Sequence, residues 1–299
     1  MPTGRSVVAT CTARAALAGN PSDGFGGAVL AVPVADLCAT VASTEAEEFE
    51  IRTADADLHI LLTATAEAYA ESVGVLPTVS ISASTTIPRS VGLAGSSALV
   101  VAALRSLGGW SERRWDRIEL AELALTVERD RLGIAAGLQD RLVQAVAHPV
   151  LMRFDPVSFV TIDVPDDVPL YVAWLADAAA PSGRVHRTLQ RRYETGDEGV
   201  IRTMRDLAIQ AERAHRALSA GDPTLLGEAI DRSFDLRAAM IDVGDHQRRL
   251  VETGRRTGAA VNSAGSGGSV VGLARDAPHL AALRDAYTAI GAGFVELST

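Results

Sequence analysis

The sequence of 299 residues contains no lysine, because all 28 of its basic side chains are arginines. This absence excludes catalysis through a lysine Schiff base, and it excludes the lysine of a Walker phosphate loop. Cysteine is scarce as well, since only Cys11 and Cys38 are present. Both stand among apolar residues without the spacing of metal ligands, so we expect buried thiols and neither a disulfide nor a zinc site.

Acidic side chains (37) outnumber arginines (28), and the sequence contains no long apolar run. The formal net charge is −9 and the isoelectric point is near 5.2, so the chain lacks the basic surface that nucleic acids require. No apolar run approaches the ~18 residues of a membrane span, and the first residues do not follow the pattern of a signal peptide. We therefore expect a cytoplasmic protein with no nucleic-acid partner and no membrane partner.

The length and the 47% share of hydrophobic residues favour two domains, since domains typically hold ~100–200 residues. An acidic, turn-rich passage, DVPDDVP at residues 163–169, marks the expected boundary. We place an N-terminal domain at residues 1–165 and a C-terminal domain at residues 166–299. Strand and helix patterns alternate in both halves, which predicts an α+β or α/β fold.

Hydrophobic periodicity and turn residues predict the individual elements. Strands are expected at residues 7–17, 28–34, 78–86, 149–154, 170–176 and 293–297, with a further short strand after the glycine-rich passage at 262–268. Helices are expected at residues 58–73, 96–107, 115–131, 138–146, 200–220, 225–240, 246–256 and 279–290.

The stretch IPRSVGLAGSSALVV, residues 87–101, places small residues between a strand pattern and a helix pattern. Such a loop directs unpaired backbone N–H groups and the positive end of a helix dipole towards one point, which favours an anion. Ser96 and Ser97 could offer a hydroxyl to a phosphate or its metal ion. The alternative is a tight turn in which a serine caps the helix. The loop matches neither GxxxxGK[ST] nor GxGxxG.

Two acidic residues downstream also point to chemistry. Glu128 continues the apolar stripe of its predicted helix, so its carboxylate should be buried and in need of a compensating charge. It could pair with an arginine or coordinate Mg²⁺. Asp140, in GLQD after Gly137, falls in the first turn of the next helix. There it could simply favour the helix dipole, or it could orient or deprotonate an attacking hydroxyl.

Together these segments resemble the GHMP kinases, a superfamily that includes galactokinase, homoserine kinase and mevalonate kinase. The phosphate loop of that superfamily reads P-x-x-x-G-L-G-S-S-A, and the chain matches it from Pro88 to Ala98 with Ala94 as one extra residue. ARAALAGNPSDGFGG resembles the first motif of the superfamily, and NSAGSGGSVVGL resembles the third. The extra Ala94 leaves open whether Ser96 or Ser97 contacts the metal.

A narrower resemblance is to the glucuronokinases. Their pattern contains A-R-x-G-L-x-G-N-P-S-D, I-P-R-x-x-G-L-x-G-S-S-A, A-G-L-Q-D-R and S-G-[KR]-V-H-x-T. This chain carries ARAALAGNPSD, IPRSVGLAGSSA, AGLQDR and SGRVHRT in the same order. The resemblance implies an α+β, two-lobed fold with an N-terminal S5-like βαβ lobe and a C-terminal ferredoxin-like lobe.

The resemblance also implies ATP and Mg²⁺ as cofactors and assigns roles to matching positions. It assigns the ATP phosphates to Pro88, Gly92, Leu93, Ala94, Gly95, Ser96, Ser97, Ala98, Gly267 and Gly268. Mg²⁺ is assigned to Ser97 and Glu128, and the acceptor hydroxyl to Asp140. Arg14 stands beside that aspartate where many members of the superfamily have a lysine, which leaves Asp140 as the acid–base group.

The implied acceptor is a small hydroxyl compound, and a sugar acid would be phosphorylated at its anomeric hydroxyl. Its hydroxyls are assigned to Asp23, and the motif residues Asn20 and Gly137 are also assigned to the substrate. Arg89, Arg184 and His186 are candidates for its carboxylate, with solvated surface charge as the alternative. Two alternative hypotheses remain. The acceptor could be another sugar, mevalonate or homoserine, or the chain could be a catalytically silent binding protein of the same fold. We expect a monomer or a homodimer.

Overall fold

The computed structural model describes residues 4–176 and 182–297, with only the backbone for residues 182–187. The chain forms two compact units, and each unit is assembled from several segments. The first unit contains residues up to Ala13, Leu37–Ile87 and Ala94–Ala147, and the second contains Arg14–Asp36, Pro88–Leu93 and His148–Thr299. A boundary of domains near residue 165 stays a prediction.

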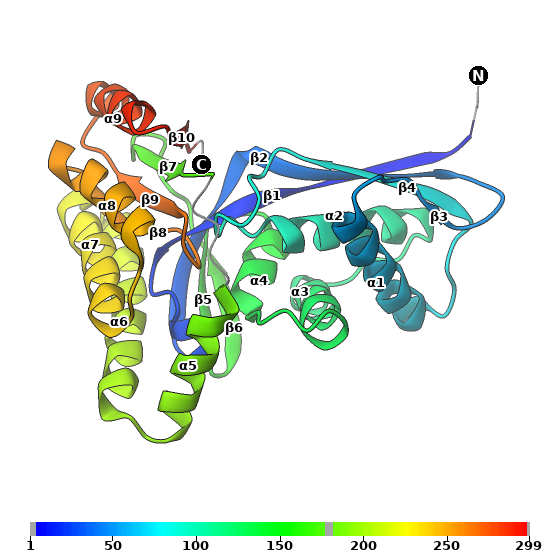
Figure 1. Ribbon diagram of the computed structural model, residues 1–299, viewed down its shortest axis with the longest axis horizontal. Coiled ribbons are helices and arrows are strands. Elements are labelled where there is room, and N and C mark those ends of the chain that lie inside the picture. The colour runs from blue at the N-terminus through cyan, green and yellow to red at the C-terminus, as the bar shows by residue number, and fades with distance from the viewer. Residues whose placement is uncertain (1–3, 177–181, 298–299) are drawn as a thin grey trace. The chain divides into compact units, whose positions relative to one another are not determined.

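The first unit combines one layer of strands with a layer of helices. Its strands are β1 (Ser6–Ala18) and β2 (Ala28–Glu45), each shared with the second unit, and β3 (Glu50–Ile51) and β4 (Val79–Thr85). Its helices are α1 (Ala56–Val73), α2 (Gly95–Trp110), α3 (Arg117–Thr126), the wider π-type turn η2 (Val127–Arg131) and α4 (Leu138–Val146). Antiparallel pairing of β2 with β4 runs from Ala39 opposite Thr85 to Glu45 opposite Val79. Figure 1 shows the helices of this unit on one side of its strands.

Local sequence explains where these helices begin and end. Asp55 accepts hydrogen bonds from the first backbone N–H groups of α1, and Gly74 ends that helix in the left-handed conformation that glycine adopts easily. Asp116 and Glu119 form a reciprocal capping box at the start of α3. The predicted buried helix is α2, whose side chains Val100, Val101 and Leu104 are fully buried.

The second unit contains a four-stranded antiparallel sheet in the order β10-β7-β9-β8. Its strands are β7 (Leu170–Trp174), β8 (Ala260–Ser263), β9 (Ser269–Leu273) and β10 (Gly293–Glu296), and the hairpin of β5 (Val150–Phe154) and β6 (Val157–Thr161) pairs with β2. Its helices are the short η1 (Ser22–Phe25), α5 (Ser182–Glu194), α6 (Glu198–Ala220), α7 (Pro223–Met240), α8 (Asp245–Thr257) and α9 (Ala277–Ala289).

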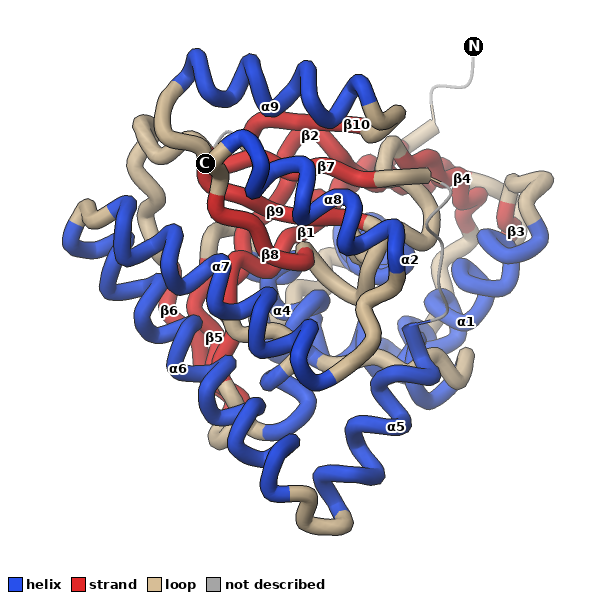
Figure 2. The backbone as a smooth tube through the Cα atoms, turned by 60° about the vertical axis from the view of Figure 1, so that its left-hand side comes forward, coloured by secondary structure: helices blue, strands red, loops and turns tan. Residues whose placement is uncertain are grey.

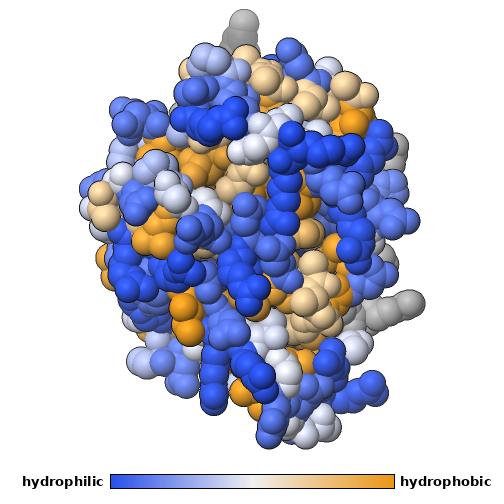
Figure 3. Space-filling model, turned by 90° about the vertical axis from the view of Figure 1, so that its left-hand side faces the viewer, coloured by the Kyte–Doolittle hydropathy of each residue, from blue (hydrophilic) through white to orange (hydrophobic). Residues whose placement is uncertain are grey.

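Aromatic and aliphatic side chains build the core of the second unit. Tyr171 of β7 stacks on Phe294 of β10 at 5.2 Å between ring centroids, and Tyr287 of α9 joins them. Figure 2 shows α8 and α9 lying over this sheet. Figure 3 shows a face of the molecule on which hydrophilic side chains predominate and apolar ones form small separate groups.

Most predicted elements are confirmed, and the differences are local. The long predicted helix at 115–131 ends as a regular helix at Thr126 and continues as η2. The sequence interpretation missed β3, β6, β8 and α5, and the second expected strand extends to Glu45. Cys11 and Cys38 are free thiols, as predicted, with Cys11 buried and Cys38 partly so. None of the described helices combines the length and apolar character of a membrane span.

Candidate functional site

The segment from Pro88 to Gly95 has an unusual backbone. Ser90, Gly92 and Ala94 adopt left-handed conformations, with φ of 57°, 76° and 61°. Alternation of this kind turns successive N–H groups towards a common point, as in backbone anion sites. Left-handed backbone costs ~1–2 kcal/mol at a non-glycine residue, so the strain at Ser90 and Ala94 is maintained by the surrounding structure.

Helix α2 starts at Gly95 with its first N–H groups free of any side-chain cap. Its N-cap is Ala94, so the alternative in which a serine caps this helix is wrong. No acidic residue lies in the first turn to neutralise the positive end of the dipole. The N-terminus of this 16-residue helix therefore retains the donors and the electrostatic potential that attract an anion.

The two loop serines have different partners. Ser97 is 1% exposed, and its hydroxyl donates to the Ala94 carbonyl oxygen at 3.1 Å. The Ser96 hydroxyl instead donates to Glu128 Oε1 at 2.6 Å. The structure thus brings Ser96, not Ser97, to the acidic residue that was paired with Ser97 in the sequence prediction.

Glu128 is fully buried, as its place on the apolar stripe predicted. Its second oxygen, Oε2, accepts from Arg141 Nε at 2.7 Å and also from Arg141 Nη2. Arg141 is itself 4% exposed, so two buried opposite charges compensate each other. The predicted alternative of an ion pair with an arginine is confirmed, while Oε1 faces the loop through Ser96.

Asp140 lies next to this buried pair, in the first turn of α4. Its Oδ2 is 3.6 Å from Arg141 Nη1, which also donates to the Gly137 carbonyl oxygen at 2.9 Å. The Asp140 side chain remains 24% exposed. A continuous series of contacts therefore connects Ser96 at the start of α2, through Glu128 and Arg141, to a partly accessible carboxylate. We call this series the acidic cluster.

In the second unit, Arg14 fastens two loops. It is 4% exposed, and its Nη1 donates to the carbonyl oxygens of Gly92 and Ala264, each at 2.8 Å. Its backbone N–H donates to the Leu93 carbonyl oxygen at 3.3 Å. These bonds hold the last residues before Ala94 against the glycine-rich passage at 264–268. The predicted role of Arg14 beside Asp140 stays a prediction.

Close contact explains the glycines in these two loops. A Cβ atom at Gly92 would lie 2.8 Å from the Gly267 carbonyl oxygen, and one at Gly265 would lie 2.1 Å from the Gly92 carbonyl oxygen. Gln247 of α8 fixes the later loop, because its Oε1 accepts from the Gly268 N–H at 2.8 Å. The Gly268 N–H therefore already has a partner inside the protein, and its predicted contact with a phosphate stays a prediction.

The turn after β1 is tied to β8 by amide side chains. Asn20, predicted to bind substrate, is 3% exposed; its Nδ2 donates to the Ser263 carbonyl oxygen and its Oδ1 accepts from Asn262. Asn20 thus positions the turn. Asp23 follows in the first turn of η1, and Phe25 packs on Tyr193 of α5 at 4.8 Å between ring centroids. We call residues 19–25, where the sequence resemblance predicts substrate contacts, the substrate turn.

The three predicted carboxylate ligands stay predictions. Arg89 is exposed. Arg184 and His186 belong to α5, but their side chains lie outside the described part of the structure. Sequence reasoning missed three buried polar residues at these loops, Arg141, Gln247 and Arg237. Arg141 could have been suspected because it stands in the AGLQDR block, whereas the other two occur in ordinary amphipathic helices.

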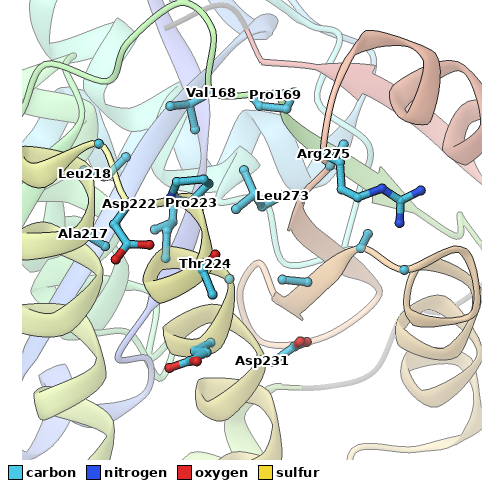
Figure 4. Close-up of a pocket in the computed structure, with 18 of the residues that line it drawn as sticks. Val168, Pro169, Ala217, Leu218, Asp222, Pro223, Thr224, Asp231, Leu273 and Arg275 are labelled. Carbon is cyan, nitrogen blue, oxygen red and sulfur yellow. The ribbon is translucent and has the colours of Figure 1, made fainter.

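A surface depression of about 870 Å³ in the second unit contains none of the predicted site residues. Figure 4 shows Asp222 and Arg275 on opposite sides of it, with Asp231 at its edge. Burial raises the pKa of the Asp231 carboxyl, although that group accepts from the Val261 N–H and from Arg255. Because Arg255 also pairs with Asp235, these charges form a structural network.

Models of two protein families match the chain. The N-terminal domain of GHMP kinases matches residues 60–147, and the C-terminal domain of GHMP kinases matches residues 214–293. The two matches together cover more than half of the chain, and the acidic cluster lies entirely within the first.

Curated relatives and solved structures agree with this assignment. The chain is 38% identical to probable glucuronokinase 2 and 34% identical to glucuronokinase 1 of Arabidopsis thaliana, over 66% and 67% of its length. It spans only 57% and 58% of those proteins. The structure of Lactococcus lactis galactokinase complexed with galactose shares the fold, with a TM-score of 0.84, 17% identity and coverage of 98% of this chain and 93% of that one.

Proposed function

Because the chain belongs to the GHMP kinase family, we propose that it transfers a phosphoryl group from ATP to the anomeric hydroxyl of a sugar acid of the glucuronate type. The observation that carries this proposal is the acidic cluster, which joins an uncapped helix N-terminus to an accessible carboxylate. Such a cluster suits a reaction that requires bound phosphates and an oriented hydroxyl.

The phosphates of ATP would lie at the start of α2. The N–H groups of Gly95, Ser96 and Ser97 belong to the first helical turn, and the dipole of α2 favours negative charge there. Backbone amides and arginines would take the place of a Walker lysine, because every basic side chain of this protein is an arginine. They stabilise the charge that spreads over the γ-phosphoryl oxygens during transfer.

The residues at this helix also fit Mg²⁺. Magnesium in proteins is usually held by one or two carboxylates together with phosphate oxygens. Glu128 Oε1 and the Ser96 hydroxyl would be its protein ligands, because Glu128 Oε2 is occupied by Arg141 and Ser97 donates to Ala94. Within the described residues there is no cluster of three or more acidic, histidine or cysteine side chains for a metal, so nucleotide oxygens would complete the coordination. Mg²⁺ would supply charge neutralisation for the phosphates.

Asp140 would act on the acceptor hydroxyl. Its carboxylate accepts the hydrogen bond of the hydroxyl and takes the proton as the acceptor oxygen bonds to the γ-phosphorus and the bond from phosphorus to ADP breaks. Arg141 keeps Asp140 in place, through the contact of 3.6 Å, while it remains bonded to Glu128. Asp23 in the substrate turn would accept hydrogen bonds from the other hydroxyls of the sugar.

The experiment is an acceptor screen at fixed ATP and Mg²⁺, with ADP release as the readout. Glucuronate, galacturonate, glucose, galactose, mevalonate and homoserine form the panel. We expect glucuronate or a close sugar acid to give the highest kcat/KM, and ³¹P NMR to show the phosphate on the anomeric oxygen. Turnover of mevalonate or homoserine alone would contradict the proposed acceptor, and absence of ADP release with every acceptor would contradict the kinase.

A further inference from the structure

Arg237 of α7 is a buried arginine with an incomplete set of partners. It is 6% exposed, and its Nη2 donates to the Ser266 carbonyl oxygen at 3.1 Å. Its Nε is buried and has no hydrogen-bond partner within the part of the chain that the structure describes. A buried donor without an acceptor costs ~1–3 kcal/mol, and more when the group is charged. Such a group in a native protein requires an explanation, and a bound ligand or ion that completes the bonding is one.

The face of α7 that carries Arg237 lies against the substrate turn and against the glycine-rich passage at 264–268. Ser233 stands one turn earlier on the same face, and its hydroxyl accepts from the Gly19 N–H at 3.3 Å. Arg237 then reaches the glycine-rich passage through Ser266. One face of α7 therefore contacts the first residue of the substrate turn and the loop that Arg14 fastens to Gly92.

Charges around Arg237 favour an incoming anion. Burial, and then the neighbouring positive charge of Arg14, lower the pKa of Arg237 to about 10, while Asp23 acts in the opposite direction. The charges of Arg237, of Arg14 and of Asp23 in the substrate turn therefore influence one another. An added carboxylate would relieve the repulsion between the two guanidinium groups and offer an acceptor to the free donor.

We propose that Arg237 binds the carboxylate of the acceptor substrate and so determines a preference for sugar acids over neutral sugars. This inference rests on the proposed kinase function and makes it specific. The planar guanidinium suits a carboxylate, because two parallel hydrogen bonds match its geometry. The acceptor is favoured over a nucleotide phosphate because Arg237 is associated with Asp23 and, through the neighbouring Ser233, with Gly19, both in the substrate turn.

The test compares Arg237→Gln with a matched control, Arg232→Gln, which removes the same charge from an exposed position of the same helix. Steady-state kinetics with glucuronate and with glucose would be measured on the full chain. We expect Arg237→Gln to raise the KM for glucuronate about tenfold or more, since charged hydrogen bonds are lost, while the KM for ATP stays within threefold. The control should match the wild type.

Several outcomes would overturn the inference. An increase in the KM for ATP alone would assign Arg237 to the nucleotide, and an unchanged preference for glucuronate over glucose would show a structural role only. If Arg237→Gln does not fold, Arg237→Lys keeps the charge without the planar fork, and we expect an intermediate loss.

Binding by the wild type separates this inference from the kinase proposal. Glucuronate should raise the melting temperature of the wild-type protein more than glucose does at equal concentration. Equal shifts would overturn the carboxylate site even if the protein is a kinase. A selective shift by glucuronate without any ADP release would instead support the site and contradict the proposed reaction.

Discussion

Glu128 in the first unit and Arg237 in the second are both buried charges, but their compensation differs. Glu128 accepts from Ser96 on one oxygen and from Arg141 on the other. Arg237 donates one hydrogen bond to a backbone carbonyl oxygen, its Nε has no partner among the described residues, and another arginine is among the charges that influence it. The carboxylate is satisfied by the protein itself, whereas the guanidinium has no carboxylate bonded to it among the described residues, although Asp23 influences its pKa.

The difference indicates which of the two buried charges is compensated by the protein before a ligand binds. A buried charge that is fully paired orients its neighbours, and here Arg141 positions both Glu128 and Asp140. A buried charge that is only partly paired stores unfavourable energy that a ligand of opposite charge can release. We therefore expect substitutions in the acidic cluster to reduce turnover and stability, and substitution of Arg237 to change chiefly the selection of the acceptor.

The largest expected effect is on turnover. Asp140→Asn should lower kcat on the best acceptor about thousandfold, because the amide cannot take the proton of the hydroxyl. The affinity for ATP should stay within a few fold, since the proposed phosphate contacts lie at α2. ADP release and nucleotide titration would be compared with Asp130→Asn, an exposed acid in η2. Near-normal turnover of Asp140→Asn would remove Asp140 from the mechanism.

The second-largest effect is expected when the ion pair between Glu128 and Arg141 is broken. Glu128→Gln keeps a hydrogen-bonding side chain beside Ser96 but leaves Arg141 buried without a counter-ion, so the free energy of unfolding should fall by about 3 kcal/mol. The Mg²⁺ concentration for half-maximal activity should rise. Urea unfolding and Mg²⁺ titration measure the two results. If the double variant Glu128→Gln/Arg141→Met recovers none of the lost stability, the ion pair is not the reason for it.

Sequence patterns predicted most of the fold and the burial of Glu128. The alternating strand at 79–85, the densely apolar α2 and the burial of Glu128 all follow from local periodicity, which the structure confirms. The helix α5 escaped prediction because its sequence, SGRVHRTLQRRYE, is strongly polar and contains few apolar residues. Strand β6 was missed because it is largely exposed.

The partners of these buried side chains could not be predicted, since they depend on contacts between residues that are distant in the sequence. Ser96 and Glu128 are 32 positions apart, and the wider turn η2 changes the direction of side chains within the helix that was expected there. Arg237 reaches Ser266 across 29 positions, and Gln247 reaches Gly268 across 21. No local pattern distinguishes these residues from other polar positions of an amphipathic helix.

A third substitution tests the packing of the glycine loops against each other. Gly92→Ala should lower the free energy of unfolding by about 2 kcal/mol, because φ is 76° and the new Cβ would lie 2.8 Å from the Gly267 carbonyl oxygen. Gly196→Ala is the matched control, with φ of 78° and no atom within 4 Å of the new Cβ, and should cost about 1 kcal/mol. Equal losses in urea unfolding would show that backbone strain, not loop contact, sets the effect.

The smallest expected change is in the stability of Arg237→Met. Because the wild-type charge is buried with few partners, its replacement by an apolar side chain should change the free energy of unfolding by less than about 1 kcal/mol. Arg141→Met should cost about 3 kcal/mol, since it leaves Glu128 buried and unpaired. Urea unfolding of both variants measures the contrast. Similar losses would mean that Arg237 is as well compensated as Arg141, and the comparison would fail.

The pH dependence of the free energy of unfolding shows whether the buried charge of Arg237 destabilises the folded protein. Burial lowers the folded-state pKa of Arg237 from its ordinary range to about 10, so the cost of burying its charge is fully present below pH 10. Above that pH the folded wild type loses the proton before the unfolded chain does. Its stability should therefore rise relative to Arg237→Met as pH increases from 10. A difference that stays constant up to pH 11 would show that the charge of Arg237 is not destabilised by its surroundings.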